Sequence, residues 1–273
     1  MIELISVSYG YNDSEDVISD ISLTINDGEF LAIVGHNGSG KSTVDKHLNG
    51  LLLPRSGQVY VNGLLTSDEE SILTIRQNVG MVFQNPDNQI VTTVVEEDVG
   101  FGPENLGIET PKIWERVDEA LELVGMTEFR KRAPHMLSGG QKQRLAIAGV
   151  LAMHPSIIVF DEATAMLDPK GREDVIAIMK DLHAAGKTIV MITQHMEEVL
   201  LSDRVIVMNA GRIAMDGTPT QIFENADKLR SMGLDVPLPV AIRDKLNASG
   251  MNIPASVLTL DSLADEIEKR LSR

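Results

Sequence analysis

The sequence has no cysteine, few aromatic residues and no long apolar run. Without cysteine, the chain can form neither a disulfide framework nor a reactive thiol. Aromatic residues make up 4% of the 273 residues, so a buried core must be built from aliphatic side chains and methionine. The apolar stretches, such as "IIVF" and "TIVMIT", are far shorter than the roughly 18 residues that span a bilayer. Any role at a membrane must therefore act through a partner.

Positive charge is also scarce. The 24 Lys and Arg residues stand against 40 Asp and Glu residues, which gives a formal net charge of −16. Broad binding of a nucleic-acid backbone requires clustered Lys and Arg, so we expect no nucleic-acid partner. A hydrophobic content of 43% is sufficient for a globular core, and 273 residues favour one large domain or one domain with an appended segment.

Short β-rich segments alternate with helical ones. Apolar strands are predicted at residues 30–35, 78–84, 156–162 and 187–195, and the segment "KSTVDKHLNGLL" after the first of them is predicted to be helical. Strands separated by helices indicate an α/β fold with a mostly parallel sheet. The segment "QVYVNG" is interpreted as an edge strand that ends at an Asn-Gly turn, and residues 204–217 as a hairpin.

Two segments break this alternation. Residues 88–155 have helical periodicity without a strong strand, so we predict a helical insertion there. Short amphipathic helices are expected within residues 221–273, with one shared apolar face. This face consists of Leu260, Leu263, Ile267 and Leu271. We therefore expect a first domain at 1–220, with the helical subdomain inside it, and a small accessory or dimerisation domain at 221–273.

A glycine-rich loop at residues 35–42, "GHNGSGKS", fits the pattern G-x-x-x-x-G-K-[ST] between a predicted strand and a predicted helix. The backbone N–H groups of such a loop surround phosphates, and the helix N-terminus adds partial positive charge. Lys41 is expected to reach the β- and γ-phosphates, and Ser42 to bind Mg²⁺ with Thr43 beside it. The predicted nucleotide-binding residues are Gly35, His36, Asn37, Gly38, Ser39, Gly40, Lys41, Ser42 and Thr43.

Polar side chains at the ends of three other apolar strands complete this predicted site. Asp161 and Glu162 end the strand "SIIVFDE", where open sheets bind ligands. We expect Asp161 in the Mg²⁺ shell and Glu162 as the general base that polarises the attacking water. Gln84, at the end of "NVGMVFQ", could contact both the metal and that water. His195, at the end of "VMITQH", could contact the γ-phosphate and hold Glu162 and the water in line.

A second glycine motif, "LSGGQ" at residues 137–141, lies about a hundred residues after the first. The ordered set "GHNGSGKS", "FQ", "LSGGQ", "IIVFDEATAMLD" and "TQH" resembles the nucleotide-binding subunit of ATP-binding cassette (ABC) transporters over residues 1 to about 220. This resemblance implies a P-loop NTPase fold with an antiparallel β subdomain. It also implies two subunits paired head to tail, each ATP lying between the phosphate loop of one and the signature loop of the other.

The resemblance implies roles for further residues. Those that contact the partner's ATP from a helix N-terminus would be Ser138, Gly139, Gly140 and Gln141. Asp168, in "MLD", resembles the residue that links the two sites across the dimer. Tyr11, in "SYGYN", occupies the place where the family stacks an aromatic ring on adenine, with Tyr9 as the alternative.

A closer resemblance is to the ATP-binding proteins of energy-coupling factor transporters, which take up vitamins and some metal ions in prokaryotes. It rests on "FQNPDNQIVTTVVEEDVGFGPENLG" (83–107) and "LDVPLP", and "DNQIVTTVVEEDV" and "DEATAMLD" are similar to the first of two ATPase paralogues. The implied partners are a second ATPase subunit (paralogue or self), a transmembrane coupling protein and a membrane-embedded substrate-binding protein. The implied place is the cytoplasmic face of the cell membrane, as a peripheral protein. Residues 83–107 are the expected docking surface, with the acidic "VVEEDV" meeting basic coupling helices.

Three alternatives stay open at this point. Within transporters, the chain could be the ATPase of a dedicated cobalt or nickel importer or of another ABC importer. A soluble cassette ATPase acting on ribosomes or DNA is a different class, which the single cassette and the acidic charge balance disfavour. A GTPase or small-molecule kinase would leave "LSGGQ" unexplained, and the chain has no Asn-Lys-x-Asp guanine motif.

Overall fold

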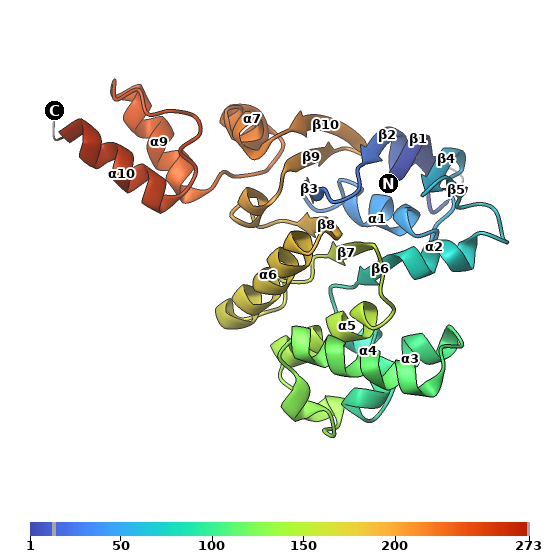
Figure 1. The fold of residues 1–273 in the computed structure, drawn as a ribbon. Coiled ribbons are helices and arrows are strands. Elements are labelled where there is room, and N and C mark those ends of the chain that lie inside the picture. The colour runs from blue at the N-terminus through green and yellow to red at the C-terminus, as the bar shows by residue number, and fades with distance from the viewer. Residues whose placement is uncertain (13–14, 272–273) are drawn as a thin grey trace.

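A mostly parallel six-stranded sheet lies at the centre of the molecule (Figure 1). The computed structural model describes residues 1–12 and 15–271. The strand order is β10-β9-β3-β8-β7-β6, and only β10 runs antiparallel to its neighbour. The strands are β3 (Phe30–Val34), β6 (Val79–Val82), β7 (Ile157–Asp161), β8 (Thr188–Thr193), β9 (Arg204–Asn209) and β10 (Arg212–Gly217). The predicted parallel sheet and the predicted hairpin are thus confirmed.

A second, antiparallel sheet has the order β2-β1-β4-β5. Its strands are β1 (Ile2–Tyr9), β2 (Ile18–Ile25), β4 (Ser56–Val61) and β5 (Leu64–Leu65). The interpretation of "QVYVNG" as an edge strand is wrong, because β4 pairs with β1 on one side and with β5 on the other. Neither β1 nor β2 was recognised from the sequence. The signal for β2 was the alternation of buried Ile21, Leu23 and Ile25 with exposed Ser22 and Thr24.

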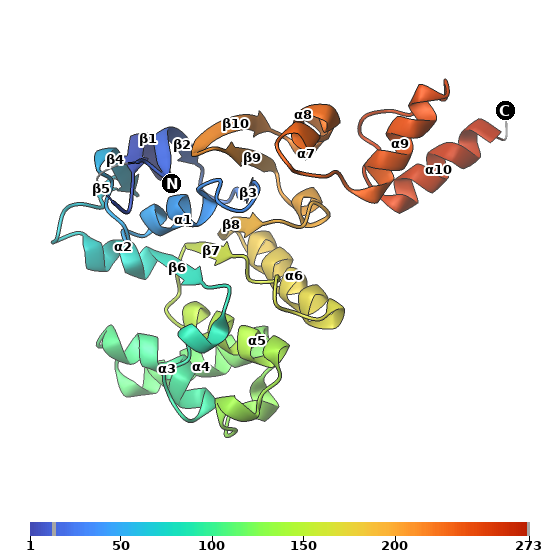
Figure 2. The same cartoon turned by 180° about the vertical axis from the view of Figure 1, so that it is seen from behind.

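Helices fill the connections and form two groups outside the sheets. Three helices connect strands: α1 (Lys41–Leu48) lies between β3 and β4, α2 (Ile72–Asn78) between β5 and β6, and α6 (Pro169–Ala184) between β7 and β8. Helices α3 (Val95–Asn105), α4 (Thr110–Leu123) and α5 (Gly139–Leu151) pack together beyond β6 and β7, as the predicted helical insertion (Figures 1 and 2). The C-terminal helices are α7 (Pro219–Phe223), α8 (Ala226–Ser231), α9 (Leu238–Ala248) and α10 (Leu260–Leu271). No helix in the described residues has the length and apolar composition needed to cross a bilayer.

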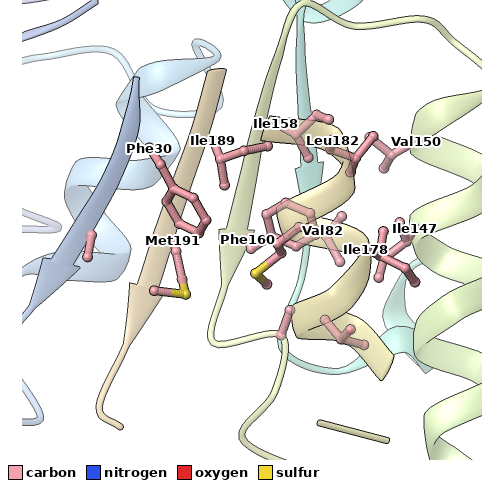
Figure 3. Close-up of a cluster of buried hydrophobic side chains, with 14 of the residues drawn as sticks. Phe30, Val82, Ile147, Val150, Ile158, Phe160, Ile178, Leu182, Ile189 and Met191 are labelled. Carbon is pink, nitrogen blue, oxygen red and sulfur yellow. The ribbon is translucent and has the colours of Figure 1, made fainter. Parts of the chain in front are cut away.

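The central sheet is buried on both faces. Along β3, Phe30, Ala32 and Val34 face one hydrophobic cluster, while Leu31 and Ile33 face the other, as the two-residue repeat of a strand requires. Figure 3 shows the first cluster, where side chains of α5 and α6 pack onto β6 and β7. The labelled members of this contact are Val82, Ile147, Val150, Ile158, Phe160, Ile178 and Leu182. The core is largely aliphatic, as the low aromatic content predicts.

Helices α9 and α10 have a small hydrophobic cluster of their own, made of Ile253, Val257 and Leu263 with Ile267 against it. The predicted shared face of α10 is only partly buried, because Leu260 at the first position of the helix is exposed. The side chain of Leu271 lies outside the described residues. Figure 1 shows this helix pair at the end of the molecule away from α3, α4 and α5.

One buried guanidinium joins the C-terminal elements. Arg243 of α9 is 3% exposed, and its Nη1 donates to the carbonyl of Ala255 at 2.6 Å. Its Nη2 donates to the carbonyl of Phe223 in α7 at 3.4 Å and to Asp244 at 2.8 Å. Arg243 therefore connects α7, α9 and the segment before α10.

We predict that Arg243→Ala destabilises the C-terminal elements by about 1–3 kcal/mol, because it leaves buried carbonyls without donors. Hydrogen exchange at residues 253–257 should speed up accordingly. The matched control is Arg230→Ala, since Arg230 is exposed and forms a local ion pair with Asp227, three residues earlier. If residues 253–257 exchanged at the same rate in both variants, Arg243 would not hold these elements together.

Candidate nucleotide-binding site

The glycine-rich loop connects β3 to α1, as predicted, and its backbone makes a tight turn. Gly40 has φ 101°, in the left-handed region, and a Cβ at this position would lie 2.7 Å from Ile18 Cγ2. A Cβ at Gly35 would lie 2.4 Å from the hydroxyl of Ser39, which is fully buried. Only glycine fits both positions, so the loop backbone can surround a small anionic group at the start of α1.

Lys41, the first residue of α1, folds its side chain back into the loop. Its ammonium donates to the carbonyl oxygens of Gly35 at 2.8 Å and His36 at 3.1 Å. Burial lowers the pKa of Lys41, and the carboxylates of Glu162 and Asp161 oppose this change. A cation held between a phosphate loop and two carboxylates is suited to binding the terminal phosphates of a nucleotide.

The carboxylate of Asp161 lies at the end of β7, close to α1. Ser42 Oγ donates to Asp161 Oδ1 at 3.4 Å, so two predicted Mg²⁺ ligands are neighbours. Asp45, one helical turn after Lys41, is fully buried, and its two carboxyl oxygens have no hydrogen-bond partner among the described residues. Burial and the adjacent Asp161 raise the pKa of Asp45 well above its usual range, and burial also raises the pKa of Asp161. Sequence reasoning missed Asp45, whose signal was an acidic residue on the inner face of α1.

Glu162 follows β7 in the left-handed region, with φ 47°, and its N–H donates to the carbonyl of Ile192 in β8. Gln84 Nε2 donates to Glu162 Oε2 at 2.9 Å, as expected for two strand ends at one edge of the sheet. Gln194 Nε2 donates to Glu162 Oε1 at 2.6 Å. Both oxygens of this carboxylate are thus held by amide donors.

The expected contact between His195 and Glu162 is not present. Gln194 occupies that position, and within the described part of the chain the His195 ring makes no hydrogen bond or ion pair. His195 still lines a cavity of about 250 Å³ that contains Gln84, Glu162 and Gln194. The sequence alone could not decide whether Gln194 or His195 contacts Glu162, because both are polar residues directly after β8.

Tyr11 lies near the C-terminal end of the phosphate loop, away from Asn37 and Gln194. It is exposed, and its hydroxyl is 3.3 Å from Thr43 Oγ1. Its ring meets that of Tyr9 edge-on at 5.2 Å, and Tyr9 in turn meets His47 at 5.0 Å. Tyr9 is therefore packed between two rings, whereas Tyr11 is the exposed ring, which favours Tyr11 as the residue that could stack on a base.

The "LSGGQ" motif begins α5 in the helical insertion. Ser138 is the N-cap, and it forms a reciprocal capping box with Gln141: the hydroxyl accepts from Gln141 N at 3.3 Å, and Ser138 N donates to Gln141 Oε1 at 2.9 Å. Ser138 and Gly139 are exposed. Within the described residues, the cavities beside the phosphate loop and Glu162 are lined by residues 35–37, 84, 162, 164–165, 193–197 and 233–236, and residues 138–141 are not among them. The two glycine motifs thus do not form one pocket within this chain.

Asp168, like Ser138, caps a helix. Its Oδ1 accepts from the N–H of Gly171 at 2.8 Å, which fixes the N-terminus of α6. Exposed apolar side chains lie next to both capping residues: Met136 precedes the signature motif and Met166 precedes Asp168, with exposed fractions of 67% and 65%.

Two acidic side chains of the expected docking surface are bound within the chain. Glu96 is buried and pairs with Arg130 and Lys131, and Asp98 accepts from the N–H groups of Val91 and Thr92. The interpretation of "VVEEDV" as a free acidic patch is therefore wrong for these two carboxylates, since they bind groups of their own chain. A cavity of about 270 Å³ lies here instead, between α3 and α5. It is lined by Gln89, Val91, Asp98, Phe101, Gly102, Asn105, Leu106, Ala146, Gly149, Val150 and Met153.

Comparison with known proteins places the sequence and the fold in one family. Residues 18–165 match the family described as ABC transporter. The energy-coupling factor transporter ATP-binding protein EcfA1 of Clostridium novyi (strain NT) is 53% identical over 272 residues, covering 98% of this chain and 97% of that protein. The protein of the same name from Symbiobacterium thermophilum is 51% identical, covering 99% and 97%.

Solved structures with the same fold include two ATP-binding cassettes. One is cbiO1 from Clostridium perfringens, described as part of the ABC transporter complex cbiONQ, with a TM-score of 0.77 at 34% identity over 89% of this chain and 98% of that one. The other is the cassette MJ0796, described as dimeric in a post-hydrolysis state bound to ADP and Pi, with a TM-score of 0.72 at 31% identity over 80% and 99%. By sequence and by fold, this chain belongs to the ABC transporter family, among the ATP-binding proteins of energy-coupling factor transporters.

Proposed function

We propose that this chain binds and hydrolyses ATP to power an importer of the energy-coupling factor type, which takes up vitamins or other micronutrients. The observation that carries this proposal is the position of Glu162. Its carboxylate lies at the same sheet edge as the phosphate loop, and both of its oxygens are fixed by amide donors. A fixed carboxylate beside a phosphate-binding loop can take the proton of a water that attacks the terminal phosphate.

The residues around Glu162 have separate roles in binding the nucleotide and in its hydrolysis. Backbone N–H groups of residues 35–42 and the N-terminus of α1 bind the phosphates, while Lys41 offsets their charge. Gln84 and Gln194 hold Glu162 in one orientation, so the proton acceptor needs little rearrangement when water attacks. Tyr11 supports the base of the nucleotide from the far end of the loop.

Mg²⁺ would be held with ATP by Ser42, Asp161 and Gln84. These side chains offer hydroxyl, carboxylate and amide oxygens, which suit a hard cation, and Ser42 and Asp161 already lie 3.4 Å apart. The described residues contain no cluster of three His, Cys, Asp or Glu side chains that could hold a metal. Phosphate oxygens and water would complete the coordination, as Mg²⁺ prefers. Bound there, the ion would neutralise charge on the phosphates.

The working unit in this proposal is a head-to-tail pair of ATPases, either two copies of this chain or this chain with a paralogue. The signature residues 138–141 are at a helix N-terminus that is suited to a phosphate, but they line no cavity with the phosphate loop. A second subunit would bring its own signature residues to this loop and cover Met136 and Met166. Asp168, beside Met166, would lie at the same junction. The description of MJ0796 as a dimer with ADP and Pi supports this arrangement.

The apolar cavity between α3 and α5 is the proposed docking site for a transmembrane coupling protein. Val91 and Phe101, which line this cavity, expose 60% and 44% of their surface. A membrane-embedded substrate-binding protein would complete the importer, with this chain peripheral at the cytoplasmic face. The description of cbiO1 as part of a transporter complex supports such an assembly.

The division of the chain follows from these roles. We assign residues 1–220 to the ATPase domain, with the helical subdomain at 88–155, and residues 221–273 to an accessory or dimerisation domain. The separate cluster of Ile253, Val257 and Leu263 supports the second unit. The exposed Leu238 and Leu260 on α9 and α10 offer apolar surface for a contact with a second subunit.

We predict that Glu162→Gln lowers the rate of ATP hydrolysis by at least about 100-fold, because an amide cannot accept the proton of the attacking water. ATP binding should be retained, as measured by fluorescence with a nucleotide analogue. The exposed Glu115→Gln on α4 is the control for the loss of one negative charge. Undiminished hydrolysis in Glu162→Gln would remove Glu162 from the role of base.

We predict that Ser138→Ala reduces hydrolysis more than tenfold while each chain still binds nucleotide, because the motif acts on the partner's ATP. The matched control is Thr218→Ala, since Thr218 caps α7 in the same kind of capping box with Gln221. Both changes should cost about 1 kcal/mol of stability, but only the first should affect turnover. Loss of the chain's own nucleotide binding in Ser138→Ala would contradict the head-to-tail arrangement.

We predict that Phe101→Asp abolishes co-purification with the membrane components and leaves the ATPase rate of the isolated protein within about twofold. A charge at the rim of the apolar cavity would be desolvated by a docked helix. Leu123→Asp, at an exposed apolar position on α4, is the control. Membrane recovery equal to that of the unchanged protein would place the docking surface elsewhere.

A further inference from the structure

One buried carboxyl group in α1 lacks the hydrogen bonds that such groups normally make. Asp45 is fully buried, and neither of its carboxyl oxygens has a hydrogen-bond partner among the described residues. The other buried acidic side chains in this part of the chain, Glu96, Asp98 and Glu198, each accept at least one hydrogen bond. A buried polar group without a partner lowers the stability of the fold. Folding alone therefore does not explain an acidic residue at position 45.

The position of Asp45 in α1 places its carboxyl group beside the proposed Mg²⁺ ligands. Asp45 follows Lys41 and Ser42 by one helical turn, so the three residues share one side of the helix. Helix α1 packs against β7, which ends at Asp161, and Asp161 accepts from Ser42 Oγ at 3.4 Å. Burial raises the pKa of Asp45, the charge of Asp161 raises it further, and the opposing charge of Lys46 does not offset them. Two carboxyl groups are therefore neighbours at this point.

A hydrated divalent cation would supply what the Asp45 carboxyl group lacks. Mg²⁺ keeps several of its waters when it binds to proteins, and those waters are hydrogen-bond donors. Acidic groups behind the direct ligands of a metal accept such bonds and orient the ligands. An apolar side chain of similar volume would be cheaper at a fully buried position that served packing alone. The unpartnered oxygens of Asp45 thus fit a site that is completed by a cation.

We propose that Asp45 is a further acidic group of the Mg²⁺ site, which raises the affinity of the nucleotide-loaded chain for divalent cations. The inference rests on the proposed function, in which Ser42, Asp161 and Gln84 hold Mg²⁺ with the nucleotide. Asp45 is a positioning residue there. It acts through Asp161 and through water of the hydration shell, and it adds a negative charge that the cation offsets.

The first test measures cation binding rather than turnover. Mn²⁺, which accepts the same oxygen ligands as Mg²⁺, is the probe, and its affinity for the ADP-loaded chain is followed by electron paramagnetic resonance. Asp45→Asn should weaken this affinity by about 10-fold, as loss of a group behind the ligands does, while ADP binding without metal stays within about twofold. Asp203→Asn is the control, since it removes the same charge at the start of β9, where Asp203 accepts from Phe30 N at 2.9 Å. Equal Mn²⁺ affinity in Asp45→Asn and the unchanged chain would overturn the inference.

The second test measures the stability of the metal-free and nucleotide-free chain by urea denaturation. Asp45→Asn should leave the midpoint unchanged or raise it, because the amide is uncharged and can donate to Asp161. Asp45→Ala should also bind Mn²⁺ more weakly. A lower midpoint for Asp45→Asn with unchanged Mn²⁺ affinity would mean that Asp45 supports only the fold, and would overturn the inference. Failure of the proposed function would look different, since ADP would then not promote Mn²⁺ binding even in the unchanged chain.

Discussion

The parallel order of β6, β7, β8 and β3 is the constraint on which the site depends. Parallel strands end at one edge of the sheet, so polar residues that follow these strands must meet there, although they are up to 157 positions apart in the sequence (Asn37 to Gln194). Gln84, Glu162 and Gln194 are joined by hydrogen bonds at this edge, next to the loop that follows β3. The buried aliphatic faces of the sheet keep the strand ends in register, so the core determines the geometry of the polar edge.

The same chain carries two phosphate-directed glycine segments that do not meet. One is the loop before α1, where Lys41 and Asp45 are buried, and the other is the exposed, capped start of α5. An ABC ATPase built this way presents a nucleotide half-site at each location, with exposed methionines beside the second. In the proposed head-to-tail pair, hydrolysis would be tied to assembly, because the groups on one chain would complete the site of another. Movement of α5 on assembly would also shift the apolar cavity that it forms with α3.

Much of this could be predicted from local sequence. The spacing of the phosphate loop, the carboxylates after β7 and the motif at the start of α5 each encode one turn or one helix end, so local sequence is enough to predict them. What failed depends on contacts between distant segments. The Gln194 amide meets Glu162, which lies 32 positions earlier, and the pairing of Glu96 with Arg130 spans 34 positions. The role of β4 in the interior of its sheet depends on β1, which lies more than fifty residues earlier.

The central claim is that one copy of this chain holds two half-sites and no complete one. The most direct measurement is the ATPase rate per subunit as a function of protein concentration, with the oligomeric state followed by light scattering in the same samples. The account predicts that the specific rate falls toward zero as the protein dissociates to monomers and rises with assembly. A specific rate that stays constant into the monomeric range would contradict it.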